Sequence, residues 1–180
     1  MELLTIVLEL DECLVFSCEA PMSQSGDFIA DNFQVYRRPF LSDFLEFVCN
    51  NFDVGIWTTR NEDFANAVIS NIWPHPHKPK FVLTELDCDI HFPIKFMGAV
   101  FNKDLECLSP YITSLRRVLA IDNEPSRYAL YLNNVMPLEG YFGGRDDRSL
   151  LTLIEKIQQI SAYHDIPRLL GGRYKALIAS

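Results

Sequence analysis

Two acidic side chains, Glu9 and Asp11, follow a short apolar stretch near the N-terminus. Residues 5–8 (TIVL) are apolar or β-branched, which predicts a strand buried on both faces. Side chains two positions apart on an extended chain project to the same side. The two carboxylates can therefore form half of a hard-cation site, or one can attack an electrophile while the other moves a proton. For the pair alone, a solvated acidic turn is the ordinary alternative.

Two other predicted strands also end in polar residues. They are Thr58 and Thr59 after residues 54–57, and Asp122 and Asn123 after residues 118–121. The carboxyl ends of parallel strands share one edge of a sheet, and open α/β sheets bind ligands beyond that edge. Each pair has an ordinary explanation, since threonine caps helices and Asp-Asn begins turns. Three such pairs at one edge favour a common site.

The elements that would position these residues alternate between strand and helix patterns. Further strands are predicted at residues 33–36, 81–84 and 134–138, and helices at 43–51 (with Ser42 as N-cap), 61–69 and 148–160. Residues 17–32 read as a long loop or small insertion, and residues 85–101 have no clear pattern. The alternation predicts an α/β fold with a doubly wound, mostly parallel sheet and helices on both faces.

Composition narrows the class of protein. The chain has 180 residues, of which 48% are hydrophobic, and this suits one domain over residues 1–180. A net charge of −8 argues against a nucleic-acid partner, and the apolar runs are too short to span a membrane. The five cysteines are odd in number and lack C-x-x-C spacing, so we expect a reducing cytoplasmic or nuclear location. The oligomeric state stays open.

Several motifs, in order along the chain, resemble one family. Asp11-Glu12-Cys13-Leu14-Val15 is similar to the Asp-Glu-Thr-Leu-Val run of the small C-terminal-domain phosphatases and NLI-interacting-factor-like proteins, in the haloacid dehalogenase superfamily. The other matching segments are Arg38-Pro39, Ile56-Trp57-Thr58-Thr59, Lys103-Asp104-Leu105 and Asp122-Asn123-Glu124-Pro125-Ser126-Arg127-Tyr128, the last resembling Asp-Asn-Ser-Pro-x-x-Tyr.

The resemblance implies a role for each matched residue. It makes Glu9 the nucleophile and Asp11 the general acid and base, with the Thr58 hydroxyl on the phosphate and Lys103 neutralising charge. It also implies Mg²⁺ as cofactor, with Glu9, Asp11, Asp122 and Asn123 as its ligands. Mg²⁺, Lys103 and the Thr58 hydroxyl would offset the negative charge of a phosphomonoester and stabilise the transition state of an in-line phosphoryl transfer.

Glu9 and Cys13 depart from the family motif Asp-x-Asp-x-Thr, which here reads Glu9-Leu10-Asp11-Glu12-Cys13. A register with Asp11 as nucleophile would put Cys13 at the acid/base position, where a thiol serves poorly. Glutamate can be a nucleophile, but its extra methylene shifts the carboxylate by about 1 Å, which can cost about 10²-fold in rate.

Three interpretations of function follow. The first is a Mg²⁺-dependent phosphoprotein phosphatase that acts through an acyl-phosphate, either with Glu9 as a working nucleophile or at a reduced rate. The second is a pseudophosphatase that binds phosphorylated partners without efficient turnover. In the third, Glu9 is an engineered or variant position of an active enzyme. Small insertions and no large cap domain suit a phosphorylated protein or peptide as substrate.

Other residues near the predicted site have competing interpretations. Phe28, Ile29 and Phe33 could form an apolar wall beside the acids, although core packing beneath the loop is favoured. Arg37, Arg38 and Arg60 could meet phosphorylated flanking residues, although such arginines are more often solvated. Trp57, inside a strand, is expected in the core.

Overall fold

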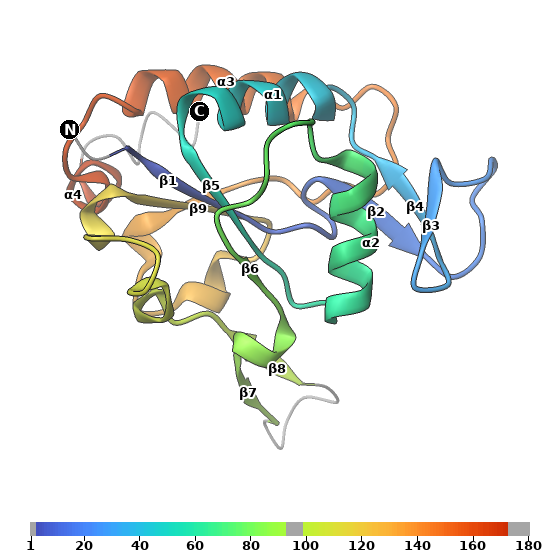
Figure 1. Ribbon diagram of the computed structural model, residues 1–180, viewed down its shortest axis with the longest axis horizontal. Coiled ribbons are helices and arrows are strands. Elements are labelled where there is room, and N and C mark those ends of the chain that lie inside the picture. Colours follow the sequence, from blue (N-terminus) through green and yellow to red (C-terminus); the bar gives the residue numbers. More distant parts are fainter. Residues whose placement is uncertain (1–2, 93–98, 173–180) are drawn as a thin grey trace.

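The computed structural model describes residues 3–92 and 99–172. Its central sheet has five strands in the order β10-β9-β1-β5-β6, and every neighbouring pair is parallel (Figure 1). The strands are β1 (Thr5–Leu8), β5 (Asp53–Trp57), β6 (Val82–Leu83), β9 (Val118–Asp122) and β10 (Val135–Pro137). The parallel sheet predicted from the alternating pattern is confirmed.

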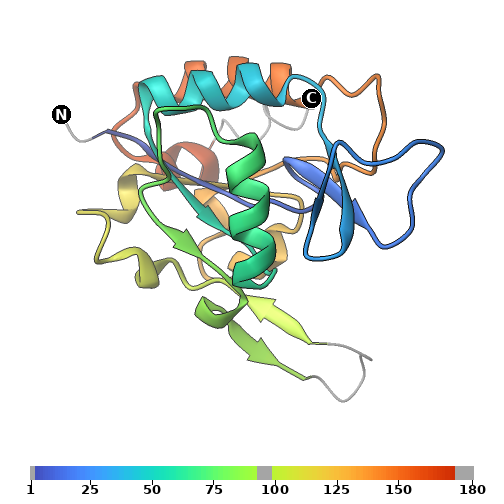
Figure 2. The same ribbon diagram turned by 45° about the vertical axis from the view of Figure 1, so that its right-hand side comes forward.

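Helices and turns cover both faces of this sheet. The α-helices are α1 (Leu41–Asn51), α2 (Glu62–Ile72), α3 (Ser149–Ile160) and α4 (Ile166–Gly171). Helices α1 and α3 lie side by side (Figure 2). The buried side chains of the four helices join one core cluster with the side chains of β1, β5 and β9 that face them. The opposite face packs against 3₁₀ turns, notably η2 (Leu105–Leu108) and η4 (Pro125–Tyr128). The remaining short turns are η1 (Glu85–Asp87), η3 (Leu115–Arg117) and η5 (Leu132–Asn134).

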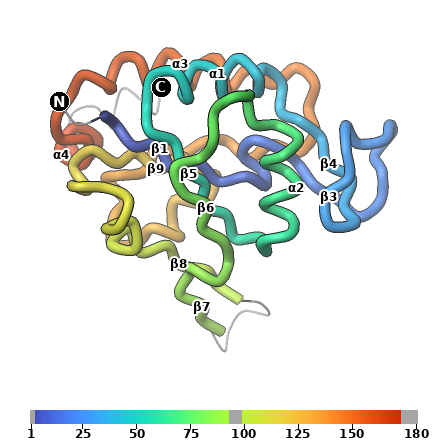
Figure 3. Tube along the Cα trace, viewed as in Figure 1, coloured from blue at the N-terminus to red at the C-terminus, as the bar shows by residue number. Residues whose placement is uncertain are grey.

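Two small antiparallel sheets extend from the central one. The first, in the order β2-β4-β3, consists of β2 (Val15–Cys18), β3 (Phe28–Ala30) and β4 (Phe33–Arg37). The second is the projecting hairpin of β7 (Asp89–His91) and β8 (Val100–Asn102), which the tube in Figure 3 shows below the sheet. Part of the segment without a clear pattern, residues 93–98, lies outside the described residues.

The insertion at residues 17–32 is thus partly ordered as strands. Phe28 and Phe33 pack against the main core, as the favoured interpretation expected, but Ile29 is 65% exposed. Alternation along β3 explains the difference, because neighbouring side chains of a strand face opposite sides. Trp57 is fully buried, as expected.

Helix α1 begins differently from the sequence prediction. Its N-cap is Phe40, in the left-handed region with φ of 63°, and Ser42 lies inside the first turn. The Leu41 N–H already donates to the Arg38 carbonyl at 3.2 Å, so the chain turns into the helix one residue before Ser42. Helix α2 has a side-chain cap, because Asn61 Oδ1 accepts from the Phe64 N–H at 2.8 Å.

The topology brings the ends of the central strands together. β1 lies between β5 and β9, and in register the last residue of β1, Leu8, pairs with Ile56 and Ile121. The segments after β1, β5 and β9 therefore leave the sheet at one edge. None of the helices in the two described ranges is long and apolar enough to cross a membrane.

Candidate active site

Glu9 stands directly after β1 and points inward. Its backbone N–H donates to the Ile121 carbonyl at 3.2 Å, which continues the β1–β9 ladder beyond the last strand residue. The side chain is 1% exposed and folds back, so that its Oε1 accepts from the Leu10 N–H at 2.8 Å. The longer side chain of glutamate makes this return possible.

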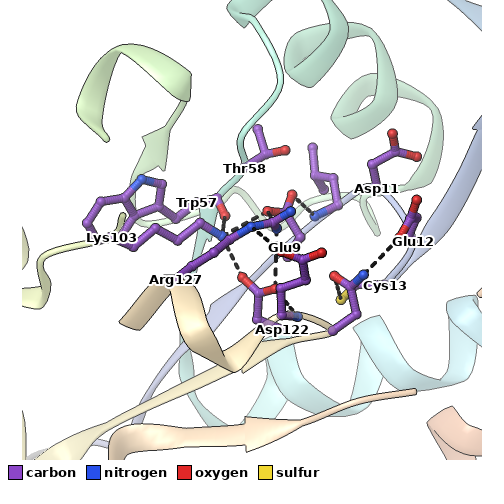
Figure 4. Close-up of polar contacts among 12 residues, drawn as sticks. Glu9, Asp11, Glu12, Cys13, Trp57, Thr58, Lys103, Asp122 and Arg127 are labelled. Atoms are coloured by element: carbon purple, nitrogen blue, oxygen red, sulfur yellow. Dashed lines mark hydrogen bonds and ion pairs between the residues drawn. The ribbon is translucent and has the colours of Figure 1, made fainter. Parts of the chain in front are cut away.

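Lys103 joins the tips of three strands through one ammonium group. It follows β8, and its Nζ donates to Glu9 Oε2 at 2.8 Å, to Asp122 Oδ2 at 2.6 Å and to the Trp57 carbonyl at 2.9 Å (Figure 4). All three ammonium protons thus have an acceptor. Lys103, Glu9 and Asp122 are buried, so each charge depends on its partners and not on water.

A second cation, Arg127, reaches the same two carboxylates. Its Nη1 lies 3.2 Å from Glu9 Oε2 and 3.4 Å from Asp122 Oδ1 (Figure 4). Sequence reasoning assigned no role to this residue, which falls on an unspecified position of the resembled motif. One signal was available: Pro125 begins a short turn shortly after the Asp122-Asn123 pair, and Arg127 lies within that turn.

Glu9, Lys103, Asp122 and Arg127 form what we call the inner cluster, with two negative and two positive charges. Burial alone raises the pKa of Glu9, but Lys103 and Arg127 outweigh burial, and the pKa is lowered. Burial, with the charge of Glu9 beside it, raises the pKa of Asp122. Burial opposes the charge on Lys103, yet Glu9 raises its pKa well above the usual value. The lysine stays charged.

Asp11 occupies a more open position. Its oxygens accept from the Ser17 N–H at 3.1 Å and the Ser17 hydroxyl at 2.8 Å, and Arg60 Nη1 lies 3.5 Å from Oδ2. Burial raises the pKa of Asp11, and the contacts with Ser17 and Arg60 only partly oppose that rise. A carboxyl group with a raised pKa suits proton transfer near neutral pH.

Arg60 is held by aromatic rings. Its guanidinium carbon lies 4.3 Å from the ring centre of Phe33 and 4.2 Å from that of Phe64. Such stacking orients the guanidinium plane and leaves its edge free for hydrogen bonds. We call Asp11 and Arg60 the outer pair.

Thr58 and Asn123 complete the set of candidate site residues. Thr58 is buried after β5, its Oγ1 accepts from the Arg60 N–H at 3.2 Å, and its hydroxyl helps to lower the pKa of Glu9. Asn123 uses both ends of its amide locally: Nδ2 donates to Glu12 at 2.9 Å, and Oδ1 accepts from the Cys13 thiol at 3.6 Å. Cys13 therefore packs against Asn123, and its burial raises its pKa well above the usual value.

Arg38 is not solvated, in contrast to the favoured interpretation of the three arginines. It is 1% exposed, pairs with Asp147 through two hydrogen bonds of 3.0 and 2.8 Å, and donates to the carbonyls of Cys13 and Glu139. It ties the loop after Asp11 to the segment before α3. Arg37 is exposed and donates to the Asn71 carbonyl.

The structure thus gathers Glu9, Thr58, Lys103 and Asp122, with Asp11 and Asn123 beside them. The residues Glu9, Asp11, Asp122 and Asn123 offer oxygen atoms, which Mg²⁺ prefers. However, no three His, Cys, Asp or Glu side chains of residues 3–92 and 99–172 are arranged to hold an ion. Arg127 and Lys103 already bind the carboxylates that the resemblance names.

Comparison with known proteins identifies relatives of this chain. A family model described as NLI interacting factor-like phosphatase matches residues 4–167. The CTD small phosphatase-like protein 2 of Dictyostelium discoideum is 28% identical over 96% of this chain and 30% of its own length. The human carboxy-terminal domain RNA polymerase II polypeptide A small phosphatase 2 is 28% identical, over 92% of this chain and 60% of its own length.

Solved structures share the fold. Fcp1, an essential RNA polymerase II CTD phosphatase, superposes with a TM-score of 0.60 over 98% of this chain and 54% of that chain, at 17% identity. The chain spans 30% to 60% of the length of four curated relatives that it matches.

Proposed function

This chain belongs to the NLI interacting factor-like phosphatase family, and we propose that it acts on phosphorylated proteins or peptides by hydrolysing their phosphomonoesters. We further propose that Glu9 makes this hydrolysis slow. One observation carries the proposal: a buried carboxylate at the tip of β1 shares the Lys103 ammonium with Asp122, beside an aspartate whose pKa is raised.

The proposed reaction has two steps. In the first, a Glu9 carboxylate oxygen attacks phosphorus, the bond to the substrate oxygen breaks, and Asp11 gives its proton to that oxygen. In the second, Asp11 takes a proton from water, the water oxygen attacks phosphorus, and the bond to Glu9 breaks. Phosphate leaves, and both carboxylates return to their initial state.

The charges of the site support this assignment. A phosphomonoester is an anion, and it must approach an anionic nucleophile. Lys103 offsets charge on Glu9, the buried Thr58 hydroxyl lies beside Glu9, and the partly exposed Arg60 guanidinium lies beside Asp11. Fixed positive groups of this kind stabilise the charge of the transition state.

Mg²⁺ is part of the expectation from the family, with Glu9, Asp11, Asp122 and Asn123 as ligands. The donor atoms suit the ion, but their arrangement does not: Arg127 Nη1 stands within 3.4 Å of both Glu9 and Asp122. In this arrangement the positive charge beside Glu9 and Asp122 comes from Lys103 and Arg127. Mg²⁺ binding at these residues stays a prediction that requires Arg127 to move.

Binding of phosphorylated partners without efficient turnover is the second candidate function. It is favoured by the state of Glu9, whose two oxygens both accept hydrogen bonds and whose side chain is 1% exposed. Attack on phosphorus requires one of these oxygens to be released. A phosphoryl group could still meet the Arg60 guanidinium, which is partly exposed beside Asp11, without reacting.

Hydrolysis of an aryl phosphate by the parent protein and by Glu9→Asp separates these functions. The shorter side chain restores the nucleophile of the family motif, and correcting a misplacement of about 1 Å is expected to raise kcat by roughly 10²-fold. The assay is run with Mg²⁺ and with a chelator. Glu46→Asp, the same change at an exposed position of α1, is the matched control and should leave the rate unchanged.

If Glu9→Asp is no faster than an inactive parent, the proposed role of position 9 is wrong. If the parent is inactive but binds a phosphopeptide in calorimetry, and Glu9→Asp gains turnover, the second candidate describes the parent. An active parent that loses all turnover in Glu9→Gln supports the first.

A further inference from the structure

In the inner cluster, the Arg127 guanidinium contacts the carboxylates of both Glu9 and Asp122, at the edge of the sheet where β1 and β9 end. Arg127 Nη1 lies 3.2 Å from Glu9 Oε2 and 3.4 Å from Asp122 Oδ1, so one nitrogen contacts both acids. Figure 4 shows the Arg127 side chain running alongside Lys103 toward Glu9 and Asp122. A divalent ion ligated by these two acids would need the same space between their oxygens.

The backbone of Arg127 is anchored, so its position does not depend on the side-chain contacts alone. Its N–H donates to the Glu124 carbonyl at 3.1 Å, and its carbonyl accepts from the Lys103 N–H at 2.7 Å. The second bond links both cations of the inner cluster through one peptide contact. The side-chain Nε also lies 3.5 Å from Glu124 Oε2, which holds the guanidinium from its outer side.

The balance of charges in the inner cluster also argues against a divalent ion between Glu9 and Asp122. Glu9 and Asp122 contribute two negative charges, and Lys103 and Arg127 contribute two positive ones. All but Arg127 are almost fully shielded from water, so an additional dication would bring excess charge into a poorly solvated place. A guanidinium remains protonated at any working pH and cannot vacate the site by losing its charge.

The length of Glu9 belongs to the same arrangement. Its Oε1 turns back to the Leu10 N–H, while its Oε2 is shared by Lys103 and Arg127. An aspartate, one methylene shorter, would not extend to both places from the same backbone. The length of the Glu9 side chain and the position of the Arg127 guanidinium therefore fit each other.

We propose that Arg127 is a built-in cation of this site, which holds the Glu9 and Asp122 carboxylates in place of a divalent ion and competes with one for them. The proposal rests on the proposed function only in assuming that the site binds a phosphoryl group. The competition between Arg127 and a metal ion follows from the contacts of Glu9, Asp122 and Arg127, and does not depend on that function.

Titration with Mn²⁺, followed by calorimetry and by the electron paramagnetic resonance of the free ion, tests the competition without any activity measurement. The parent is expected to bind with a Kd weaker than about 1 mM. Arg127→Gln removes the competing charge and should bind at least about tenfold more tightly. Arg116→Gln is the matched control, because its side chain is 76% exposed and its nearest acid, Asp165, is 3.8 Å away.

A parent Kd tighter than about 1 mM overturns the proposal, and so does an affinity of Arg127→Gln that equals that of the parent. Should Arg127→Gln fail to fold, Arg127→Lys keeps one positive charge in a shorter reach. It should then bind Mn²⁺ more tightly than the parent, and equal binding contradicts the proposal. The parent titration needs no variant at all.

A titration with inorganic phosphate in the presence of a chelator distinguishes this proposal from the proposed function. If Arg127→Gln gains Mn²⁺ affinity while neither protein binds phosphate, the role of Arg127 stands and the proposed function fails. If the parent binds phosphate but Arg127→Gln gains no Mn²⁺ affinity, the proposed function stands and the role of Arg127 is wrong.

Discussion

Glu9 and Asp11 are two residues apart on one loop, yet their pKa values shift in opposite directions. Glu9 lies in the inner cluster with two cations in contact, and its pKa is lowered despite burial. Asp11 lies in the outer pair with one arginine at 3.5 Å, and its pKa is raised. The difference shows that burial alone does not set the protonation of an acid, because the number and distance of its partners decide the direction.

The inner cluster and the outer pair should also differ in what they contribute, the first to stability and the second to proton transfer. A fully buried ion pair is costly to break, because the remaining partner keeps its desolvation penalty, whereas partly exposed pairs contribute little. The inner cluster should therefore determine whether the strand tips stay together. The outer pair should determine how a proton is moved.

Removal of the shared lysine is expected to have the largest effect. Lys103→Met leaves Glu9 and Asp122 with one cation between them, and should lower the free energy of unfolding by about 3–5 kcal/mol. Urea unfolding measures the loss. Lys80→Met, which breaks a half-exposed pair with Asp53, is the matched control and should cost less than about 1 kcal/mol. Equal losses in the two variants would contradict the expected difference between buried and exposed ion pairs.

Asp11→Asn should separate activity from stability. As the proposed proton donor and acceptor, Asp11 contributes to both steps, and its loss should lower kcat by about 10²-fold or more. In the parent, we expect the first step to weaken as pH rises through the raised pKa of Asp11, since only the protonated form can donate. Asn should abolish that limb of the pH profile. A profile unchanged in Asp11→Asn assigns the proton transfer to another group.

The same variant should be slightly more stable near neutral pH. A raised pKa means that the folded state binds the proton of Asp11 more tightly than the unfolded state. The folded protein therefore loses stability as pH rises from about 3.8 through that pKa. Asn carries no charge and escapes this loss, so urea unfolding at pH 7 should show a small gain over the parent. A clear loss would mean that the hydrogen bonds with Ser17 dominate.

The smallest effect is expected for Arg60→Gln. Its ion pair with Asp11 is partly exposed and its two ring contacts are modest, so unfolding should become easier by about 1 kcal/mol. Because Arg60 lowers the pKa of Asp11, the variant should raise that pKa further, which carbon NMR of the carboxyl group can follow. Arg60→Lys keeps the charge but loses the planar stacking; if it behaves like the parent, the rings are not what positions Arg60.

Much of the site was predictable because β-strand periodicity and the parallel topology act through general rules. Apolar runs that end in Glu9, Thr58 and Asp122 predict buried strands, and parallel strands bring their ends to one edge. The lysine after β8 was identified only through family resemblance, since residues 85–101 carry no clear pattern. The roles assigned to these residues stay proposals.

Other features depend on contacts between distant segments. The burial of Arg38 is decided by Asp147 and by two carbonyls brought near it in the fold. The start of α1 at Leu41 depends on the left-handed turn at Phe40, which overrides the capping preference of Ser42. The burial of Arg38 does not follow from local sequence, because its partners are distant along the chain. The start of α1 does not follow either, because the preference for a capping residue is worth only about 1 kcal/mol.

The amino-acid sequence by itself determined which carboxylates and hydroxyls follow the predicted strands, since the strand pattern is local and repeats along the chain. Only the tertiary structure decided how their charges are paired. Glu9 folds back, Arg127 spans it and Asp122, and Asp11 is left to Ser17 and Arg60. The physical reason is that charge pairing varies steeply with distance and burial, and both are set by the packing of the whole chain.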